Sequence, residues 1–216
     1  VIGAAGHNDP LRKSEWDEES LNIPVKFVLM SGDFEDALEL HFGSVAPGGY
    51  AWKFPKQGGA NIGVGIQTSL ARGKSLNEYS EEFISRYEGR VEFRGAGSLP
   101  MSGSIDSFVK GNHLLVGDAA GMVLPSNGAG ITIAMIGGRI AGQVVAEHLR
   151  DGTQLSEYEV RWEEQMGKVM RNSKRAFRIG SLMFRLPNWI LNLAFNPLTR
   201  GIIWRAVTCR RMFWLL

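Results

Sequence analysis

One stretch constrains the fold more than any other: LLVGDAAGMVLPSNGAGITIAM, over residues 114–135. Its short apolar run stops at Gly117 and Asp118, small residues and Pro125 follow, and a glycine-rich segment at 128–130 opens a long apolar run. This order predicts a buried strand, a tight turn and a helix. Glycines on both sides of the turn indicate that a ligand or another backbone lies very close to it.

The start of such a helix suits a negatively charged ligand. The first amide N–H groups of a helix have no partner within it, and glycines there let a flat ring approach. Reduced flavin carries negative charge around N1 and the C2 carbonyl, which a helix start at 128–131 would stabilise. Asp118 can accept hydrogen bonds from the hydroxyls of a ribityl chain. The alternative is that Asp118 only caps a local turn and that the glycines serve helix packing.

The longer string LLVGDAAGMVLPSNGAGITIAMIGGRIAG resembles the C-terminal flavin motif of FAD-dependent oxidoreductases of the aromatic-hydroxylase type. The resemblance implies that FAD is the cofactor, that the Asp binds its ribityl chain, and that the following helix points at the isoalloxazine ring. By match of position, it implies these cofactor-binding residues: Gly117, Asp118, Pro125, Gly128, Ala129, Gly130 and Ile131.

Residues 22–70 have the pattern of an antiparallel sheet, with short strands separated by Gly, Pro and Asp. Tyr50, Trp52 and Phe54 alternate along one of these strands and therefore share one face, and Pro55 is expected to end it. An aromatic wall of this kind suits a long hydrocarbon. Periodicity alone favours the alternative that the rings form an ordinary packing face of the sheet.

The complete string PGGYAWKFPKQGGANIGVG, residues 47–65, resembles the signature of the geranylgeranyl reductase family, in which Tyr-x-Trp-x-Phe-Pro is followed by Gly-x-Gly. The resemblance implies a flavoenzyme that saturates carbon–carbon double bonds in geranylgeranyl chains, including those of archaeal membrane lipids and of chlorophyll and tocopherol precursors. It implies a prenyl pocket beside the flavin, with Tyr50, Trp52, Phe54 and Pro55 binding the substrate. It leaves the catalytic acid unassigned, and Tyr50 is one candidate.

The implied fold is the C-terminal part of an FAD-binding fold of the glutathione-reductase type, of mixed α+β and α/β class. An antiparallel substrate-binding sheet and a helical C-terminal region complete it. We expect four parts: the end of the FAD-binding domain at 1–15, the substrate-binding β domain at 16–104, an FAD-binding strand and helix at 105–150, and a basic helical region at 151–216.

Three helices are predicted in more detail. Ser75 and Glu78 have the spacing of a capping box, for a helix that stops at Gly89. Apolar residues on nearly every face predict that the helix over 130–149 is internal, and Gly138 and Gly142 predict close contact with another backbone. One long helix is expected from residue 155 to residue 180.

Two features depart from the family pattern. The Gly-x-Gly-x-x-Gly segment that holds the ADP half of FAD is absent from this sequence, and only VIGAAGHNDPLR resembles the last strand of that domain. Its turn contains Ala5-Gly6 where the family has Asp-Gly, which removes a polar contact to the cofactor. We therefore expect the chain to be the C-terminal portion of a longer enzyme.

Positive charge is concentrated in the C-terminal quarter. No acidic residue occurs from Gln165 to Leu216, whereas the basic residues there are Lys168, Arg171, Lys174, Arg175, Arg178, Arg185, Arg200, Arg205, Arg210 and Arg211. With Trp189, Trp204 and Trp214, this pattern predicts peripheral contact with anionic membrane lipid, and a solvated helical cap is the alternative. Nucleic-acid binding is not predicted, because these residues form no compact motif. No apolar stretch reaches the roughly 18 residues of a spanning helix, so we expect a cytoplasmic protein that is peripheral on the membrane.

The single cysteine, Cys209, excludes an internal disulfide, a cysteine-based zinc site and a self-contained iron–sulfur cluster, and we predict no metal site. The expected electron donor is reduced ferredoxin or a nicotinamide nucleotide. Two other functions stay open. One is a protein like electron-transfer flavoprotein–quinone oxidoreductase, and the other is a non-catalytic fragment that binds lipid or a partner.

Overall fold

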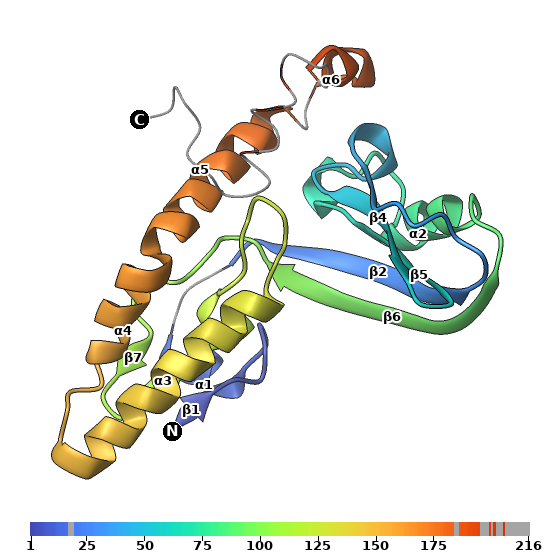
Figure 1. Ribbon diagram of the computed structural model, residues 1–216. Coiled ribbons are helices and arrows are strands. Elements are labelled where there is room, and N and C mark those ends of the chain that lie inside the picture. Colours follow the sequence, from blue (N-terminus) through green and yellow to red (C-terminus); the bar gives the residue numbers. More distant parts are fainter. Residues whose placement is uncertain (17–19, 184–185, 195–198, 200, 202–204, 206–216) are drawn as a thin grey trace. The chain divides into compact units, whose positions relative to one another are not determined.

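The computed structural model describes residues 1–16, 20–183, 186–194, 199, 201 and 205 (Figure 1). The chain divides into two compact units. Unit 1 comprises residues 1–21, 99–180 and 197–216, and unit 2 comprises residues 22–98 and 181–196. The predictions for Arg185, Arg200, Trp204, Cys209, Arg210, Arg211 and Trp214 concern positions outside the described residues.

Unit 1 contains a three-stranded sheet in the order β1-β8-β7. Its strands are β1 (Ile2–Gly3), β7 (Val109–Lys110) and β8 (His113–Leu115). Strand β1 runs parallel to β8, and β7 runs antiparallel to β8. The helical elements are α1 (Pro10–Glu15), the 3₁₀ turn η3 (Gly117–Ala120), α3 (Ile131–Asp151), α4 (Glu157–Trp162), the π-helical turn η4 (Glu163–Gly167) and α5 (Lys168–Met183). The helix expected over 155–180 is thus present, with a π turn in it.

The core of unit 1 lies where α3 and α4 cover the end of β8. Leu114 and Leu115 are buried together with Ile140 and Val144 of α3. The hydroxyl of the buried Tyr158 donates to the carbonyl oxygen of Leu115 at 3.2 Å, which ties α4 to the strand. This contact fixes the strand immediately before Gly117, where the turn begins.

Helix α3 differs from the sequence-based expectation of an internal helix. Its buried residues, Ile133, Gly137, Ile140, Ala141 and Val144, lie on one side of the helix. On the other side Ile131 is 83% exposed and Met135 is 71% exposed. A Cβ added at Gly138 or Gly142 would meet no heavy atom of another described segment within 4 Å. The prediction that another backbone packs closely against Gly138 and Gly142 is therefore wrong for the described part of the chain. Apolar composition alone does not decide which face of a helix other segments cover.

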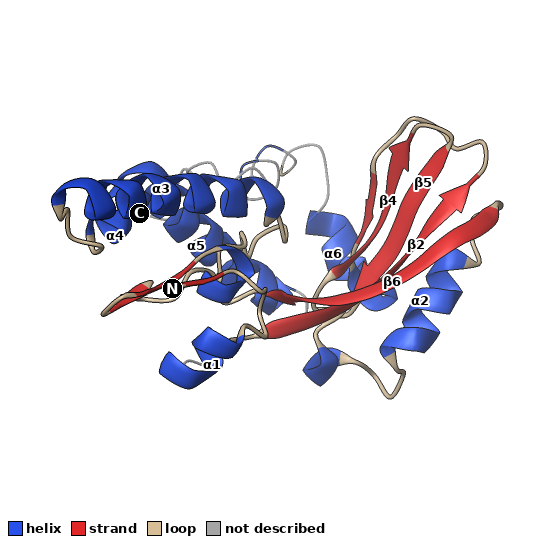
Figure 2. Ribbon diagram, turned by 90° about the horizontal axis from the view of Figure 1, so that it is seen from below, coloured by secondary structure: helices blue, strands red, loops and turns tan. Residues whose placement is uncertain are grey.

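Unit 2 contains a five-stranded sheet in the order β3-β4-β5-β2-β6 (Figure 2). Its strands are β2 (Asn22–Ser31), β3 (Glu39–His41), β4 (Tyr50–Lys56), β5 (Gly59–Gly65) and β6 (Arg90–Pro100), accompanied by the turns η1 (Gly43–Val45) and η2 (Thr68–Leu70). The pairs β3–β4, β4–β5 and β5–β2 are antiparallel. The prediction that Pro55 ends β4 is wrong, since the strand continues to Lys56, which pairs with Gly59. The chain then turns at Gln57 and Gly58, and Gly58 has a φ of 73°.

Helix α2 (Leu76–Ile84) covers one face of this sheet (Figure 2). It begins with the predicted capping box, in which the Ser75 hydroxyl accepts from the Glu78 amide and the Glu78 carboxylate accepts from the Ser75 amide. It ends at Ile84, before Gly89. Its buried side packs with residues of β2 and β5, among them Val28, Ile62 and Val64. A short helix, α6 (Asn188–Ala194), completes the described part of unit 2.

Candidate functional site

The first candidate site is the turn that follows β8 in unit 1. Gly117 has a φ of 64° and Gly121 a φ of 65°, a backbone conformation that glycine adopts most easily. The amide of Gly121 donates to the Asp118 carbonyl oxygen at 3.0 Å, and the amide of Met122 donates to the Gly117 carbonyl oxygen at 3.0 Å. The two glycines let the chain reverse within five residues and leave the Asp118 side chain at the surface of the turn.

The Asp118 carboxylate is partly buried, and burial raises its pKa above the ordinary value, with a small opposing effect from His7. Among the described residues, none donates a hydrogen bond to this carboxylate. A carboxylate that is partly removed from water and receives no protein donor is suited to accept hydrogen bonds from hydroxyl groups of a ligand.

Sequence reasoning missed the residue that holds this turn in place. Arg12 of α1 is 5% exposed, and its Nη1 donates to the carbonyl oxygens of Asp118 at 3.4 Å and Ala119 at 3.1 Å. Asp9 caps the same helix by accepting from the amides of Leu11 and Arg12. The one sequence signal for this role is Asp9-Pro10, a pattern typical of a helix start, with Arg12 two residues after the proline.

The connection from the turn to α3 is folded tightly on itself. The Leu124 carbonyl oxygen accepts from the amide of Gly128 at 2.8 Å, and the Leu124 amide donates to the Ala129 carbonyl oxygen at 2.9 Å. Gly128 has a φ of 73°, and Pro125 is buried. A second residue that the sequence did not reveal, Ser173 of α5, is fully buried and accepts from the amide of Ser126 at 3.0 Å.

The start of α3 lies beside Asp118. Gly130 is the N-cap residue, and among the described residues no side-chain hydrogen bond caps the first amides of α3. A Cβ on Gly130 would lie 3.5 Å from Oδ1 of Asp118 and 3.2 Å from Cγ2 of Val123. The turn and the helix start therefore present a carboxylate and a set of amide donors at one place, and a side chain at Gly130 would be in tight contact with Val123.

The second candidate site is the face of the unit 2 sheet opposite α2. In the register of β4 and β5, Trp52 lies opposite Gly63 and Tyr50 lies opposite Gly65. A Cβ on Gly63 would overlap the Trp52 indole, at 2.7 Å from Cε2 and from Cη2. The indole N–H donates to Oδ1 of Asn61 at 2.7 Å. Gly63 therefore leaves the space across which the ring of Trp52 lies, which explains the spacing of the motif in physical terms.

The aromatic side chains form a row along β4. Ring centroids of Tyr50 and Trp52 are 5.8 Å apart, and those of Trp52 and Phe54 are 6.0 Å apart in a stacked arrangement. The row also contains Phe42, 6.1 Å from Tyr50, which the sequence analysis did not assign. Burial raises the pKa of the Tyr50 phenol, so this hydroxyl stays protonated at neutral pH.

The same face continues across the sheet to β2 and β6. Phe27 lies opposite Gly63 on the other side of β5, and its ring is 6.1 Å from that of Phe93, which is 53% exposed. A Cβ on Gly95 would overlap the Phe27 ring. Aromatic rings and glycines thus share this face, which presents an apolar surface suited to a hydrocarbon chain.

The sequence-predicted residues fall into these two groups. Unit 1 brings together Gly117, Asp118, Pro125, Gly128, Ala129, Gly130 and Ile131, and unit 2 brings together Tyr50, Trp52, Phe54 and Pro55. Within the described residues, no group of three or more His, Cys, Asp or Glu side chains could hold a metal ion. In that part of the chain, no helix is long and apolar enough to cross a membrane.

A model of the geranylgeranyl reductase catalytic domain matches residues 21–96, which contain most of the unit 2 sheet. Digeranylgeranylglycerophospholipid reductase 2 of Methanothermobacter thermautotrophicus is 40% identical over 67% of this chain and 39% of its own length. Digeranylgeranylglycerophospholipid reductase of Methanocella arvoryzae is 33% identical over 82% of this chain and 46% of its own length. The chain thus spans less than half the length of the curated relatives that it matches.

Solved structures show a similar fold. A geranylgeranyl bacteriochlorophyll reductase-like protein from Thermoplasma acidophilum has a TM-score of 0.79 and 23% identity, over 99% of this chain and 59% of that protein. A probable FAD-dependent monooxygenase from Pseudomonas aeruginosa has a TM-score of 0.59 and 19% identity, over 85% of this chain and 56% of that protein. These similarities confirm the expected fold class, in which an antiparallel sheet and C-terminal helices belong to a flavoprotein fold.

Proposed function

Because this chain belongs to the geranylgeranyl reductase family, we propose that it is the C-terminal portion of an FAD-dependent enzyme that reduces carbon–carbon double bonds in geranylgeranyl chains of membrane lipids or isoprenoid precursors. The observation that carries the proposal is the aromatic row of β4, laid over Gly63 in the segment that matches the family. The reductases named above act, by their names, on a digeranylgeranyl phospholipid. We propose the same substrate class here.

In this proposal, the turn of Asp118 and the start of α3 hold part of FAD. The seven residues from Gly117 to Ile131 assigned above fit the group, because the Asp118 carboxylate lies beside the start of α3, and no described side chain donates to that carboxylate or caps that helix. Asp118 would accept hydrogen bonds from ribityl hydroxyls, and the amides after Gly130 would donate to the electron-rich edge of the ring. When bound, FAD supplies the hydride that reduces the double bond.

The aromatic face of unit 2 binds the prenyl chain. Tyr50, Trp52 and Phe54 offer an apolar row that excludes water from the chain and lets it slide between successive double bonds. The assignment of Pro55 to this surface is corrected: Pro55 pairs with Ala60 of the core on the α2 side, so by strand alternation it belongs to the opposite face. The partly buried phenol of Tyr50 stays protonated and is the candidate proton donor to the substrate double bond.

The remaining parts of the proposal concern the ADP half of FAD, the division of the chain into domains, and the electron donor. The ADP half of FAD is bound by a nucleotide-binding region that the full-length enzyme contributes. Residues 1–15 and 105–150 are assigned to that FAD-binding domain, 16–104 to the substrate domain, and 151–216 to a basic region. The electron donor is reduced ferredoxin or a nicotinamide nucleotide.

We also propose peripheral contact with anionic lipid on the cytoplasmic side. In α6, Trp189 and Leu193 are each 65% exposed while Leu191 is buried, so one side of this helix offers aromatic and aliphatic anchors. Exposed cations of α5, including Arg175 and Arg178, supply attraction to lipid headgroups. Replacing Trp189 by Ala should lower binding to vesicles that contain phosphatidylglycerol, whereas Glu88→Ala, an exposed change in unit 2, should not.

The function is tested on the full-length enzyme. Flavin content is measured by absorbance, the flavin is reduced anaerobically, and a geranylgeranyl phospholipid is added while flavin reoxidation and lipid saturation are followed. Reoxidation coupled to lipid saturation is expected. If the reduced flavin is not reoxidised by the lipid but is reoxidised by a quinone, the proposal is refuted in favour of quinone oxidoreductase activity. If the protein retains no flavin, the reductase proposal is also refuted, and binding of lipid or of a partner is the remaining function.

Two variants connect this test to the structure. Asp118→Asn should lower flavin retention, and its matched control is Asp106→Asn, an exposed carboxylate in the same unit. Trp52→Ala should leave flavin content unchanged and slow reoxidation by the lipid, because it removes the central ring of the row. Equal flavin content in both aspartate variants would contradict the assignment of Asp118.

A further inference from the structure

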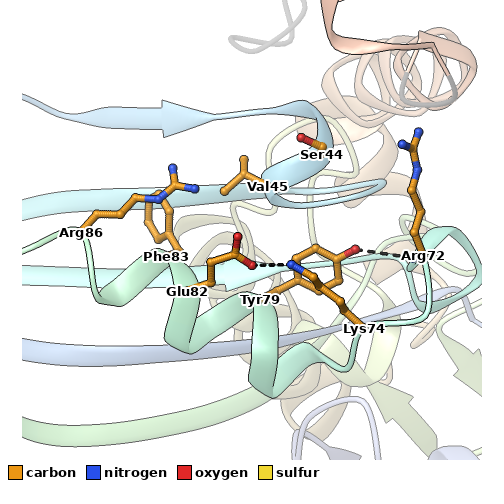
Figure 3. A pocket seen from close by; sticks show the side chains of 8 residues that line it. All are labelled: Ser44, Val45, Arg72, Lys74, Tyr79, Glu82, Phe83 and Arg86. Carbon is orange, nitrogen blue, oxygen red and sulfur yellow. Dashed lines mark hydrogen bonds and ion pairs between the residues drawn. The ribbon is translucent and has the colours of Figure 1, made fainter.

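Unit 2 contains a pocket that neither candidate site uses (Figure 3). Its volume is about 260 Å³, and it lies between η1 and the α2 side of the sheet, on the face away from the aromatic row. The pocket is lined from η1 by Ser44 and Val45, and from the loop before α2 by Arg72 and Lys74. It is also lined by Glu82, in the last turn of α2, and by Arg86, just after that helix.

The charges that line this pocket do not balance. Nζ of Lys74 lies 2.7 Å from a carboxylate oxygen of Glu82, so these two residues neutralise each other. Neither Arg72 nor Arg86 forms an ion pair with any carboxylate among the described residues. Two guanidinium groups therefore remain as excess positive charge around one hollow, and both side chains are accessible to solvent.

Buried aromatic residues of α2 position both arginines. The hydroxyl of Tyr79, a residue buried in the core, accepts a hydrogen bond from the backbone amide of Arg72 at 3.4 Å, which holds the loop against the helix. The guanidinium of Arg86 lies 5.3 Å from the centroid of the fully buried Phe83 ring. These contacts hold the backbone of Arg72 and the guanidinium of Arg86, so a ligand bound in the pocket costs less conformational entropy at Arg86.

We propose that this pocket binds a phosphate ester group. A guanidinium presents two parallel N–H donors that match the oxygens of phosphate. Two such groups lining one pocket suit the dianion of a phosphate monoester best, and each can also pair with the single charge of a diester. The ligand is the phosphate of a lipid headgroup or of a soluble phosphate ester. The proposal goes beyond the function proposed above, because none of its residues belongs to the flavin or prenyl assignments.

The test is a titration of the full chain at low salt with glycerol 1-phosphate by calorimetry, and with vesicles of phosphatidylglycerol or phosphatidylcholine by cosedimentation. Arg72→Gln and Arg86→Gln should each weaken binding by roughly three- to tenfold. Glu82→Gln should tighten it, because the change removes the negative charge of the pocket. Arg90→Gln, an exposed arginine of unit 2 outside the pocket, is the matched control and should bind as the wild type does.

The two probes distinguish the two sources of phosphate. Saturable binding of glycerol 1-phosphate that is weaker in Arg72→Gln and Arg86→Gln and tighter in Glu82→Gln supports a soluble ester. Binding only to phosphatidylglycerol vesicles, with the same ranking of the variants, supports a lipid headgroup. Binding of neither probe overturns the proposal, as does binding that is equal in Arg86→Gln and Arg90→Gln. Flavin retention and reoxidation by prenyl lipid are separate readouts, so failure here is distinguishable from failure of the reductase proposal.

Discussion

Replacing Gly63 by Ala tests whether the glycines of the motif exist to seat the Trp52 indole. The added methyl carbon would lie 2.7 Å from two atoms of the ring, well inside van der Waals contact. The ring cannot slide along the row, because Tyr50 lies 5.8 Å from it on one side and Phe54 lies 6.0 Å from it on the other. It must rise from the sheet, which breaks the 2.7 Å hydrogen bond to Asn61.

Overpacking of this kind lowers the free energy of unfolding by about 1–3 kcal/mol, and loss of the neutral hydrogen bond accounts for about 1 kcal/mol of this. We expect Gly63→Ala to destabilise the chain by about 2 kcal/mol. For a chain of this size, that corresponds to a decrease in Tm of roughly 4–8 °C. The matched control is Gly97→Ala in β6, where the added carbon meets only Cγ2 of Val25, at an ordinary 3.7 Å. The control should be neutral or slightly stabilising, because Ala restricts the unfolded chain.

The assay is thermal unfolding followed by far-ultraviolet circular dichroism, with hydrogen exchange of the β4 and β5 amides to assign the loss to unit 2. A double-mutant cycle isolates the contact: in a Trp52→Leu background, Gly63→Ala should cost much less than in the wild type. If Gly63→Ala costs no more than Gly97→Ala, or the same amount with and without the indole, the explanation of the motif is wrong.

Three further predictions concern single side chains. The pKa of Glu39 is lowered to about 2, chiefly by its contact with Lys53, so its stabilisation should be present above pH 4.5 and be lost as pH falls toward 2. Glu39→Gln should cost about 1–2 kcal/mol at pH 7, because Lys53 is only 3% exposed, and denaturant titrations should show this difference shrinking in acid. Arg12→Met should cost about 1–3 kcal/mol and speed hydrogen exchange in the turn of Asp118, since two carbonyl oxygens lose their buried donor. Ser75→Ala should cost about 1 kcal/mol by removing the helix cap, and Asn77→Ala, an exposed change in the first turn of the same helix, should cost nothing measurable in the same thermal assay.

The sequence predicted the local parts of both candidate sites. Strand alternation placed Tyr50, Trp52 and Phe54 on one face, and the capping box located the start of α2. The glycine pattern located the turn at Gly117 and the start of α3 near Gly130. Each of these features depends on side-chain direction, backbone sterics or hydrogen bonds within a few residues, which a local pattern determines.

The sequence could not reveal residues that act across long separations. Arg12 reaches the turn of Asp118 from a helix more than a hundred residues earlier in the chain. Ser173 holds Ser126 from α5, and Phe42 extends the aromatic row from outside β4. An isolated Arg, Ser or Phe carries no local pattern, so only the packing of distant segments assigns these roles.

The sequence by itself thus determined the elements, the residues of each motif and the family to which they belong. The tertiary structure decided which surfaces are covered: α3 is apolar on nearly every side, yet only one side is buried by the described residues. It also decided that the Trp52 indole lies over Gly63 and that Arg72 and Arg86 line one pocket. Periodicity records the chemistry of a side chain and its direction from the backbone, whereas burial, register and charge balance depend on what the fold brings opposite it.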